Sequence, residues 1–481
     1  MHKTETILIK NSLFLIGGRL ISRILQFFLF IYAARVLGVE KFGIFSYAFA
    51  FVALLTVFMD LGISRYFVQQ ASRNIKNIHK FMGASFVVKI ILITFALSFI
   101  ILVGPFFQKG YKTIYVFAIL GVTVAFDNLT IVFSSVFQAD ERMDYQSIII
   151  IISNTLMAAA GFLFIFFYPN LIVYCLVFLS GAVLRFVLSF IWCVKKYGAP
   201  VMVYDSGFHT ELVKKGLPFA LTTIFVGIYY YIDTFLLNIY SGEKIVGYYN
   251  ASYRLIEAPL FITAALTTAL FPTASKLYSQ GKQQLKKMMQ KVFPLSVTFG
   301  LTISIAAAFF SKELILFIYG SQYEQSALVF PILILSVSVI MPNAVMGTII
   351  RAIDRQSVSA RLTGAGAILN VLMNLIVIPV YSFVGAAWTT LATEVFILVV
   401  SLILVQRYIE GMFNPLLFVK IFIFVFCMTA FLYSSSAIGI VAQLILYCLM
   451  SPLLLMLLRF LNWKDIKGVM DGFSGHGEIA A

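Results

Sequence analysis

Two arginines, Arg19 and Arg23, lie one helical turn apart within an apolar segment that extends over residues 7–36. A guanidinium at the centre of a bilayer costs roughly 2.5–3.5 kcal/mol on insertion scales, so two on one helix face indicate a buried counter-charge or an anionic ligand. Because paired arginines bind phosphate oxygens in a bidentate manner, the spacing predicts a site for phosphate or diphosphate. The alternative is a structural ion pair with Asp60 or Asp127.

Other ionisable side chains also fall within apolar segments, where they are functional candidates by default. Arg185 and Arg254 are candidates to complete the diphosphate site. Arg185 and Lys89 lie within about two turns of a predicted cytoplasmic edge and can also snorkel toward it. A buried carboxylate can take up a proton or a sodium ion, or can instead neutralise an arginine. The carboxylates predicted to line a pathway or to couple it to an ion are Asp60, Asp127, Asp233 and Glu394.

Signatures of soluble enzymes are absent from the sequence. It contains no phosphate-binding loop, no dinucleotide-binding motif, no zinc-protease motif and no nucleophile elbow. The four cysteines have no C-x-x-C spacing and the four histidines are scattered, so we predict no metal site. We therefore expect a protein that is not an enzyme and has no cofactor, with H⁺ or Na⁺ as the possible coupling ion.

The segments that must position these side chains are apolar and long. Hydrophobic residues make up 61% of the 481 residues, charged residues make up 11%, and the mean hydropathy is +0.98, which excludes a soluble globular protein. The apolar segments are about 20 residues long, enough to cross a hydrocarbon core of about 30 Å. The sequence predicts an all-α polytopic membrane protein with about fourteen spans. Two of them, 362–381 and 383–406, have almost no loop between them.

The net charge of +15 follows the predicted membrane and does not indicate nucleic-acid binding. If the N-terminus is cytoplasmic, most lysines and arginines fall in inside segments, as the positive-inside rule requires. The basic residues in the predicted outside loops are Lys41, Lys109, Lys112, Lys244 and Lys312. We predict a multi-pass protein of the bacterial cytoplasmic (inner) membrane with both termini in the cytoplasm.

A weak internal repeat divides the chain. Residues 40–48 recur as residues 243–251 with one insertion, each copy between the first and second spans of a six-span block. Two blocks with an even number of spans insert in the same direction, which gives parallel repeats around a central cavity. The predicted domains are an N-terminal six-helix lobe (1–205), a C-terminal six-helix lobe (206–410), two extra transmembrane helices (411–461) and a cytoplasmic tail (462–481).

Several segments carry a resemblance to a known group. They are Asn11-Ser12 and residues 18–23, 34–43, 60–65, 247–251 and 319–323. These segments resemble the bacterial polysaccharide-biosynthesis exporters, the O-antigen and capsule flippases of the multidrug/oligosaccharidyl-lipid/polysaccharide exporter superfamily. The resemblance implies a two-lobed bundle that moves a polyprenyl-diphosphate-linked oligosaccharide from the inner to the outer leaflet by alternating access. The implied partners are that substrate and membrane lipid, with a polysaccharide polymerase and chain-length proteins as candidates.

Three alternatives stay open at this point. Lipid II flippases and teichuronic-type exporters share the implied architecture. An ion-coupled multidrug antiporter of the same superfamily would bind cations, which the arginines of the first span disfavour. A membrane scaffold of a polysaccharide-synthesis complex would have no transport activity of its own.

Overall fold

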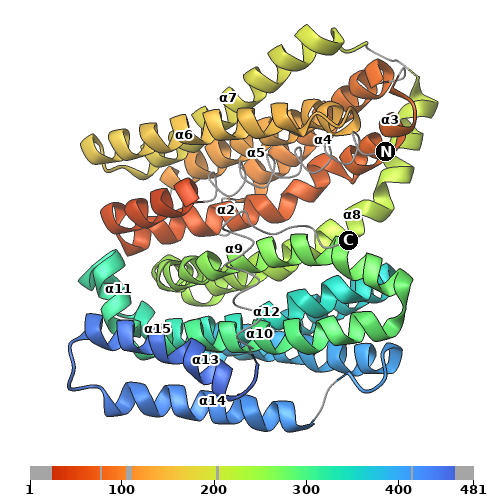
Figure 1. Ribbon diagram of the computed structural model, residues 1–481. Coiled ribbons are helices and arrows are strands. Elements are labelled where there is room, and N and C mark those ends of the chain that lie inside the picture. Colours follow the sequence, from red (N-terminus) through yellow and green to blue (C-terminus); the bar gives the residue numbers. More distant parts are fainter. Residues whose placement is uncertain (1–23, 76–77, 105–110, 202–204, 413–414, 461–481) are drawn as a thin grey trace. The chain divides into compact units, whose positions relative to one another are not determined.

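The computed structural model describes the chain except residues 1–23, 76–77, 105–110, 202–204, 413–414 and 461–481 (Figure 1). The described residues form helices and turns without any strand, which confirms the all-α membrane class. By length and hydropathy, 11 of the described helices can cross a membrane, or 12 if the bent helix 206–241 counts as one span. The number of about fourteen stays a prediction, because most of the expected first span lies outside the described residues.

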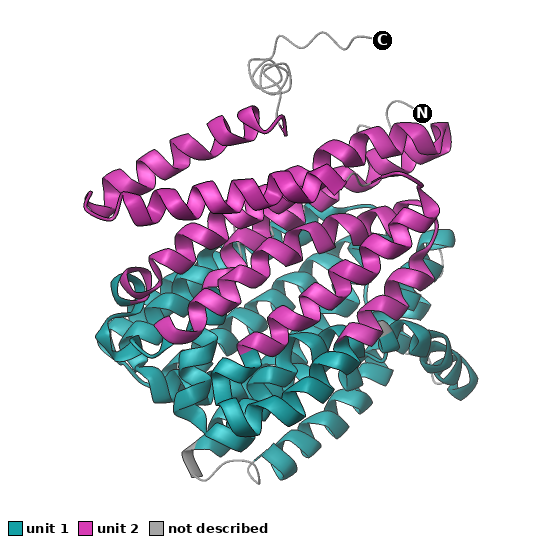
Figure 2. Cartoon of the chain, turned by 90° about the horizontal axis from the view of Figure 1, so that it is seen from below, with its two compact units in different colours: residues 1–254, 316–326, 367–386 teal, residues 255–315, 327–366, 387–481 magenta. Residues whose placement is uncertain are grey.

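The chain folds into two compact units, which Figure 2 distinguishes by colour. Unit 1 comprises residues 1–254, 316–326 and 367–386. Its complete helices are Ile24–Leu37, α2 (Val39–Asp60), α3 (Ile63–Arg73), α4 (Ile78–Val103), α5 (Tyr111–Ala139), α6 (Met143–Phe167), α7 (Leu171–Tyr197), α8 (Ser206–Ser241) and the 3₁₀ turn η3 (Ser321–Tyr323). Helix α5 packs against α2, α3, α4 and α7, so that it forms the centre of this unit.

The junction between α2 and α3 is the feature that shapes the site described below. Leu61 and Gly62 both adopt positive φ angles, 46° and 74°, which end α2 and restart the helix as α3. A Cβ atom on Gly62 would lie 2.2 Å from the carbonyl oxygen of Gly216, so only glycine allows this approach of α8. Tyr66 of α3 donates a hydrogen bond to Glu211 of α8, and burial together with this bond raises the pKa of the tyrosine.

The two copies of the internal repeat meet through a pair of glycines. A Cβ atom on Gly43 of α2 would overlap the carbonyl oxygen of Glu243, and one on Gly247 would lie 2.1 Å from the carbonyl oxygen of Val39. Each copy therefore places its glycine against the backbone that precedes the glycine of the other copy. The two backbones approach so closely that only glycine, which has no Cβ atom, fits at these positions.

Unit 2 comprises residues 255–315, 327–366 and 387–481. It contains most of α9 (Glu243–Gln280), α10 (Lys282–Phe309), α12 (Ser326–Ala352), α14 (Pro415–Ser434) and α15 (Ile440–Leu457). Helix α11 (Ser311–Tyr319) contributes its first residues. The core is apolar and draws on α9, α10, α12 and the C-terminal half of α13 (Gln356–Tyr408). Helices α14 and α15 pack against each other, and α14 also packs against α10.

Helix α13 is 53 residues long, far more than one span requires, and is interrupted at Ser382. The φ and ψ angles of this residue, 50° and −137°, are not helical, and its hydroxyl donates to Ser241 Oγ at 2.8 Å. The boundary predicted between spans 362–381 and 383–406 falls at this residue. The lobe boundaries predicted from the repeat stay a prediction.

Candidate functional site

The two arginines that open the sequence argument, Arg19 and Arg23, lie outside the described residues. The site can therefore be built only from the remaining candidates, and six of the eight are described. Five of them belong to unit 1: Asp60, Asp127, Arg185, Asp233 and Arg254. Glu394 belongs to unit 2.

Asp60, the last residue of α2, forms an ion pair with Lys89 of α4. The Lys89 Nζ atom lies 2.6 Å from Asp60 Oδ1 and also donates to the carbonyl oxygen of Asn128 at 3.0 Å. Lys89 is completely buried, whereas the Asp60 side chain is 22% exposed. The expectation that Lys89 snorkels toward the membrane edge is wrong, because the carboxylate of a neighbouring helix compensates its charge within the bundle.

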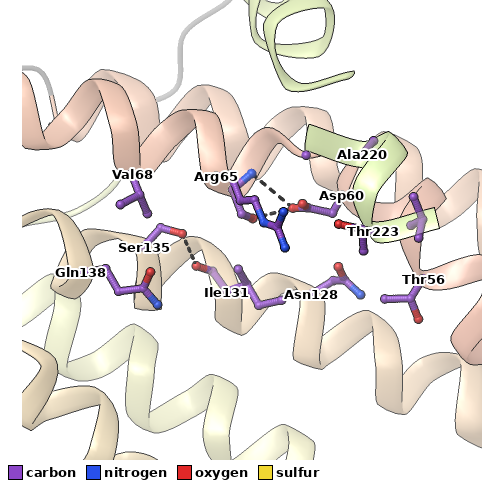
Figure 3. A pocket seen from close by; sticks show the side chains of 13 residues that line it. Thr56, Asp60, Arg65, Val68, Asn128, Ile131, Ser135, Gln138, Ala220 and Thr223 are labelled. Carbon is purple, nitrogen blue, oxygen red and sulfur yellow. Dashed lines mark hydrogen bonds between the residues drawn. The ribbon is translucent and has the colours of Figure 1, made fainter. Parts of the chain in front are cut away.

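Figure 3 shows side chains that line a cavity beside Asp60. The cavity has a volume of about 380 Å³, and both polar and apolar side chains line it. Residues of α2, α3, α5 and α8 line it, and most of its polar groups are hydroxyls and amides. Arg65 of α3 extends its guanidinium into the space between Asp60 and Asn128 (Figure 3). Asp60 and Arg65 make no ion pair, as their five-residue spacing on opposite sides of the α2–α3 junction leads one to expect. The cavity volume lies within the range of small-molecule sites.

Arg185 of α7 is held by two neighbouring helices. Its Nε and Nη2 atoms donate to Asp127 Oδ1 of α5 at 3.0 and 2.8 Å, and its Nη1 atom donates to Asn154 Oδ1 of α6 at 2.6 Å. The Arg185 side chain is 15% exposed and that of Asp127 is 38% exposed. The expectation that Arg185 snorkels is wrong, since it crosses to α5 and α6. Asp127 neutralises an arginine, which is one of the two roles expected for it.

Arg254 lies at the end of unit 1 on α9 and covers an aromatic cluster. Its guanidinium carbon is 3.8 Å from the centre of the Phe30 ring, a cation–π distance. The Phe30 ring in turn contacts Tyr174 and Phe178 of α7. The arginine is half-buried, and the stacking fixes the plane of its guanidinium group.

Asp233 of α8 is a buried carboxylate that accepts hydrogen bonds from two neutral side chains. The hydroxyl of Tyr249 donates to its Oδ2 atom at 2.8 Å, and Asn374 Nδ2 donates to its Oδ1 atom at 2.6 Å. Asn374 also donates to Asn370 Oδ1, while its own Oδ1 atom is buried and has no hydrogen-bond partner within the described part of the chain. The result is a compact group of oxygen atoms around one carboxylate.

Glu394 of α13 makes a comparable contact within unit 2. Asn343 of α12 donates from Nδ2 to Glu394 Oε2 at 2.7 Å and to the backbone carbonyl of the same residue at 2.9 Å. The glutamate is 6% exposed. Across the described residues there is no group of three or more His, Cys, Asp or Glu side chains that could hold a metal ion.

Most hydrogen-bond partners of the predicted site residues are residues that were not themselves predicted to belong to the site. Asparagines are the common partners, and none was singled out from the sequence. They are Asn154, Asn343 and Asn374. The signal was available, because an amide inside an apolar span needs a polar partner for the same reason that a charge does.

The sequence is similar to known families of membrane proteins. Residues 8–278, more than half of the chain, match the family model described as "Polysaccharide biosynthesis protein", and residues 218–376 match the MatE model. The chain is 25% identical over 403 residues to a putative O-antigen transporter of Shigella dysenteriae, covering 81% of this chain and 97% of the relative. It is 21% identical over 386 residues to the capsular polysaccharide biosynthesis protein CapF of Staphylococcus aureus, covering 79% and 95%.

A solved structure has a similar fold. The lipid II flippase MurJ in an inward closed conformation superposes with a TM-score of 0.76 at 17% identity, covering 95% of this chain and 99% of that one. At this identity the likeness extends to the fold alone. Because the family model matches residues 8–278, more than half of the chain, the protein belongs to the polysaccharide biosynthesis protein family of multi-pass membrane transporters.

Proposed function

We propose that this protein is a flippase that moves a polyprenyl-diphosphate-linked oligosaccharide, an O-antigen or other surface-polysaccharide repeat unit, from the cytoplasmic to the outer leaflet. One observation carries the proposal: the apolar helices of unit 1 surround a cavity that several polar side chains line, and they hold Arg185 and Arg254, whose planar donors suit phosphate. Family membership and the names of the relatives support it. The proposal includes alternating access and no enzymatic step.

The diphosphate site consists, in this proposal, of Arg19 and Arg23 together with Arg185 and Arg254. Arginine suits the role because its planar donors match two phosphate oxygens at once. Arg185 is already bonded to Asp127, so a diphosphate would replace that carboxylate as the acceptor. Asp127 would then be released, and its charge is partly exposed in the structure.

The coupling step is assigned to the carboxylates, with Asp233 as the strongest candidate. Tyr249 and Asn374 donate hydrogen bonds to its two carboxylate oxygens, and the Oδ1 atom of Asn374 has no hydrogen-bond partner among the described residues. Either a proton or a sodium ion would suit such a group of oxygens. Asp60, Asp127 and Glu394 line the pathway in the same proposal.

The proposal also covers the membrane in which the protein acts and the proteins that receive its product. The protein acts in the bacterial inner membrane with both termini in the cytoplasm, where a substrate assembled on the inner leaflet is available. Membrane lipid surrounds it, and a polysaccharide polymerase and chain-length proteins receive its product. The orientation of the termini rests on the distribution of lysine and arginine along the chain. The membrane and the partners rest on the family to which the chain belongs.

Reconstitution tests the proposal directly. The purified full-length chain in liposomes should move a lipid-linked oligosaccharide to the outer leaflet, measured by enzymatic access to the glycan from outside. Replacing both Arg19→Gln and Arg23→Gln should lower the initial rate at least tenfold, while the exposed Arg73→Gln on α3 should leave it unchanged. Liposomes that show no transport with the wild-type chain would contradict the flippase and favour a scaffold role.

Lipid II is the second substrate to test, because the fold resembles that of a lipid II flippase. Presenting lipid II and an O-antigen-type lipid-linked oligosaccharide to the same liposomes separates the two. Transport of lipid II alone would replace the proposed substrate. Efflux of cationic dyes against a sodium or proton gradient, with neither lipid transported, would favour a multidrug antiporter.

A further inference from the structure

The cavity beside the Asp60–Lys89 pair has a composition that diphosphate binding alone does not explain. Of the described residues that line it, two are charged, Asp60 and Arg65. The charge of Asp60 is compensated by Lys89 at 2.6 Å. Arg65 is exposed and makes no ion pair within the described part of the chain, so the cavity presents one net positive charge.

The other polar groups present acceptors to the cavity. Thr56, Ser135 and Thr223 each donate the hydroxyl proton to a carbonyl of their own helix, four residues earlier. Their oxygen lone pairs are left for other donors. The cavity wall therefore accepts hydrogen bonds at several points, while its donors are Arg65 and the amide of Gln138, which already donates one hydrogen bond to Gln146.

Two stronger acceptors add to this pattern. Asn128 is 1% exposed, and its Oδ1 atom has no hydrogen-bond partner among the described residues. Its Nδ2 atom, by contrast, donates to the carbonyl of Val124. Asp60 uses Oδ1 for both Lys89 and Ser64, while Oδ2 accepts no described hydrogen bond. A buried amide oxygen without a partner destabilises the protein, and a ligand donor would relieve that cost.

We propose that this cavity binds an anionic sugar, a saccharide unit that bears a phosphate or a carboxylate, as a subsite for the head group of the transported lipid. Arg65 binds the anionic group through its guanidinium, and the hydroxyls of the sugar donate to Asn128 Oδ1 and Asp60 Oδ2. A ligand with one negative charge and several hydrogen-bond donors would satisfy both the guanidinium of Arg65 and the acceptor oxygens of the cavity. The inference rests on the proposed flippase function, because a sugar of this kind reaches the cavity as part of the substrate.

Two other ligands fit the cavity less well. A sodium ion would use the acceptor oxygens, but the guanidinium of Arg65, which makes no ion pair among the described residues, would repel it. Inorganic phosphate would satisfy Arg65 and leave the acceptors without donors. Both are therefore useful competitors in a binding experiment.

The experiment measures binding of soluble sugars to the full-length protein in lipid nanodiscs by saturation-transfer difference NMR, which detects weak ligands. The probes are glucose 1-phosphate and glucuronate, with glucose as the comparator. Inorganic phosphate and sodium chloride have no proton signal of their own and are added as competitors, whose binding is measured by the loss of the sugar signal. At least one of the two anionic sugars should bind ten times more tightly than glucose or phosphate. Preference for glucose 1-phosphate assigns the glycosyl phosphate to the cavity, and preference for glucuronate assigns an acidic residue of the oligosaccharide.

Variants connect the binding to the named atoms. Arg65→Gln should reduce the affinity for the anionic sugar to that for glucose, and Asn128→Leu, close in shape, should weaken glucose and the anionic sugar by the same factor. Arg73→Gln removes an exposed charge from the same helix outside the cavity and should change neither. A melting curve for each variant confirms that it is folded.

Three results would overturn the inference: no binding of either anionic sugar to the wild-type chain, equal binding of inorganic phosphate, or full affinity in folded Arg65→Gln. Sodium that displaces the sugar would also overturn it. Transport measured on the same preparation separates this inference from the function. Transport without sugar binding removes only the subsite, whereas Arg65-dependent sugar binding without transport removes the flippase and leaves a carbohydrate site.

Discussion

Two of the ion pairs in the described part of unit 1, Lys89–Asp60 and Arg185–Asp127, differ in how far water or a ligand can reach them. Lys89 is fully buried, and its ammonium group contacts both Asp60 and a backbone carbonyl. Arg185 and Asp127 are 15% and 38% exposed. The second pair leaves Asp127 Oδ2 without a described hydrogen bond, and its arginine has a geometry that suits phosphate. The difference separates a pair that holds helices together from a pair that can exchange one partner for a substrate.

The buried pair also positions the cavity that lies next to it. By fixing Asp60 at the end of α2, Lys89 determines where the carboxylate faces Arg65 and Asn128. The cost of two buried charges is recovered only when both are present, since loss of one leaves the other without compensation. The more exposed pair carries less of that cost, because solvent screens its charges.

The largest effect is expected from Lys89→Met, which removes the cation and keeps a long side chain. Asp60 would lose its counter-charge, and the free energy of unfolding should fall by roughly 3–5 kcal/mol. The measurement is chemical or thermal denaturation of the purified protein in detergent. Adding Asp60→Leu should restore much of the loss; a single variant as stable as Arg73→Gln would show that the pair does not hold α2 to α4.

A smaller loss of stability is expected from Arg185→Gln, about 1 kcal/mol, because the pair is partly exposed. Transport should nevertheless fall at least tenfold, since the glutamine cannot form a bidentate contact with a phosphate group. Initial transport rates in liposomes and melting curves give the two quantities. Arg142→Gln is a suitable control, as it removes an arginine that pairs locally with Asp144. If stability collapses and transport per folded molecule is kept, the two pairs have the same role.

Double-mutant cycles would sharpen the same contrast. Residues in contact show coupling energies of roughly 0.5–3 kcal/mol. We expect the Lys89–Asp60 pair near the upper end and the Arg185–Asp127 pair near the lower end, measured from the unfolding of single and double variants. Reversal of this order would mean that exposure of the side chains does not determine how strongly each pair is coupled.

The smallest effect is a difference in salt dependence. Raising the ionic strength from 0.05 to 0.5 M shortens the Debye length severalfold, and partly exposed charges are screened more than buried ones. The coupling energy of Arg185 with Asp127 should fall by a few tenths of a kcal/mol, while that of Lys89 with Asp60 should stay constant. Equal falls for both pairs would place Lys89 within reach of mobile ions.

The fold class could be predicted from the sequence because hydropathy is a local property. The break at Ser382 was predicted for the same reason, since two apolar segments meet there with almost no loop between them. The glycines of the repeat were visible as a pattern, and the structure shows why glycine is required at Gly43 and Gly247.

The partners within the site could not be predicted in the same way. Lys89 lies 29 positions from Asp60, and Arg185 lies 58 positions from Asp127, so each pair depends on which helices become neighbours. Each span offers several polar groups, and sequence alone does not say which two face each other. The asparagines were not predicted because they carry no charge, although a buried amide needs a hydrogen-bond partner just as a buried ion does.

The contact between Gly43 and Gly247 has a consequence for how this protein can vary. A methyl group on either residue would push the two backbones apart, and the gap it opens would admit a methyl group on the other. Two such substitutions should therefore cost less together than the sum of each alone. We therefore expect Gly43 and Gly247 to tolerate substitution as a pair better than either tolerates it alone.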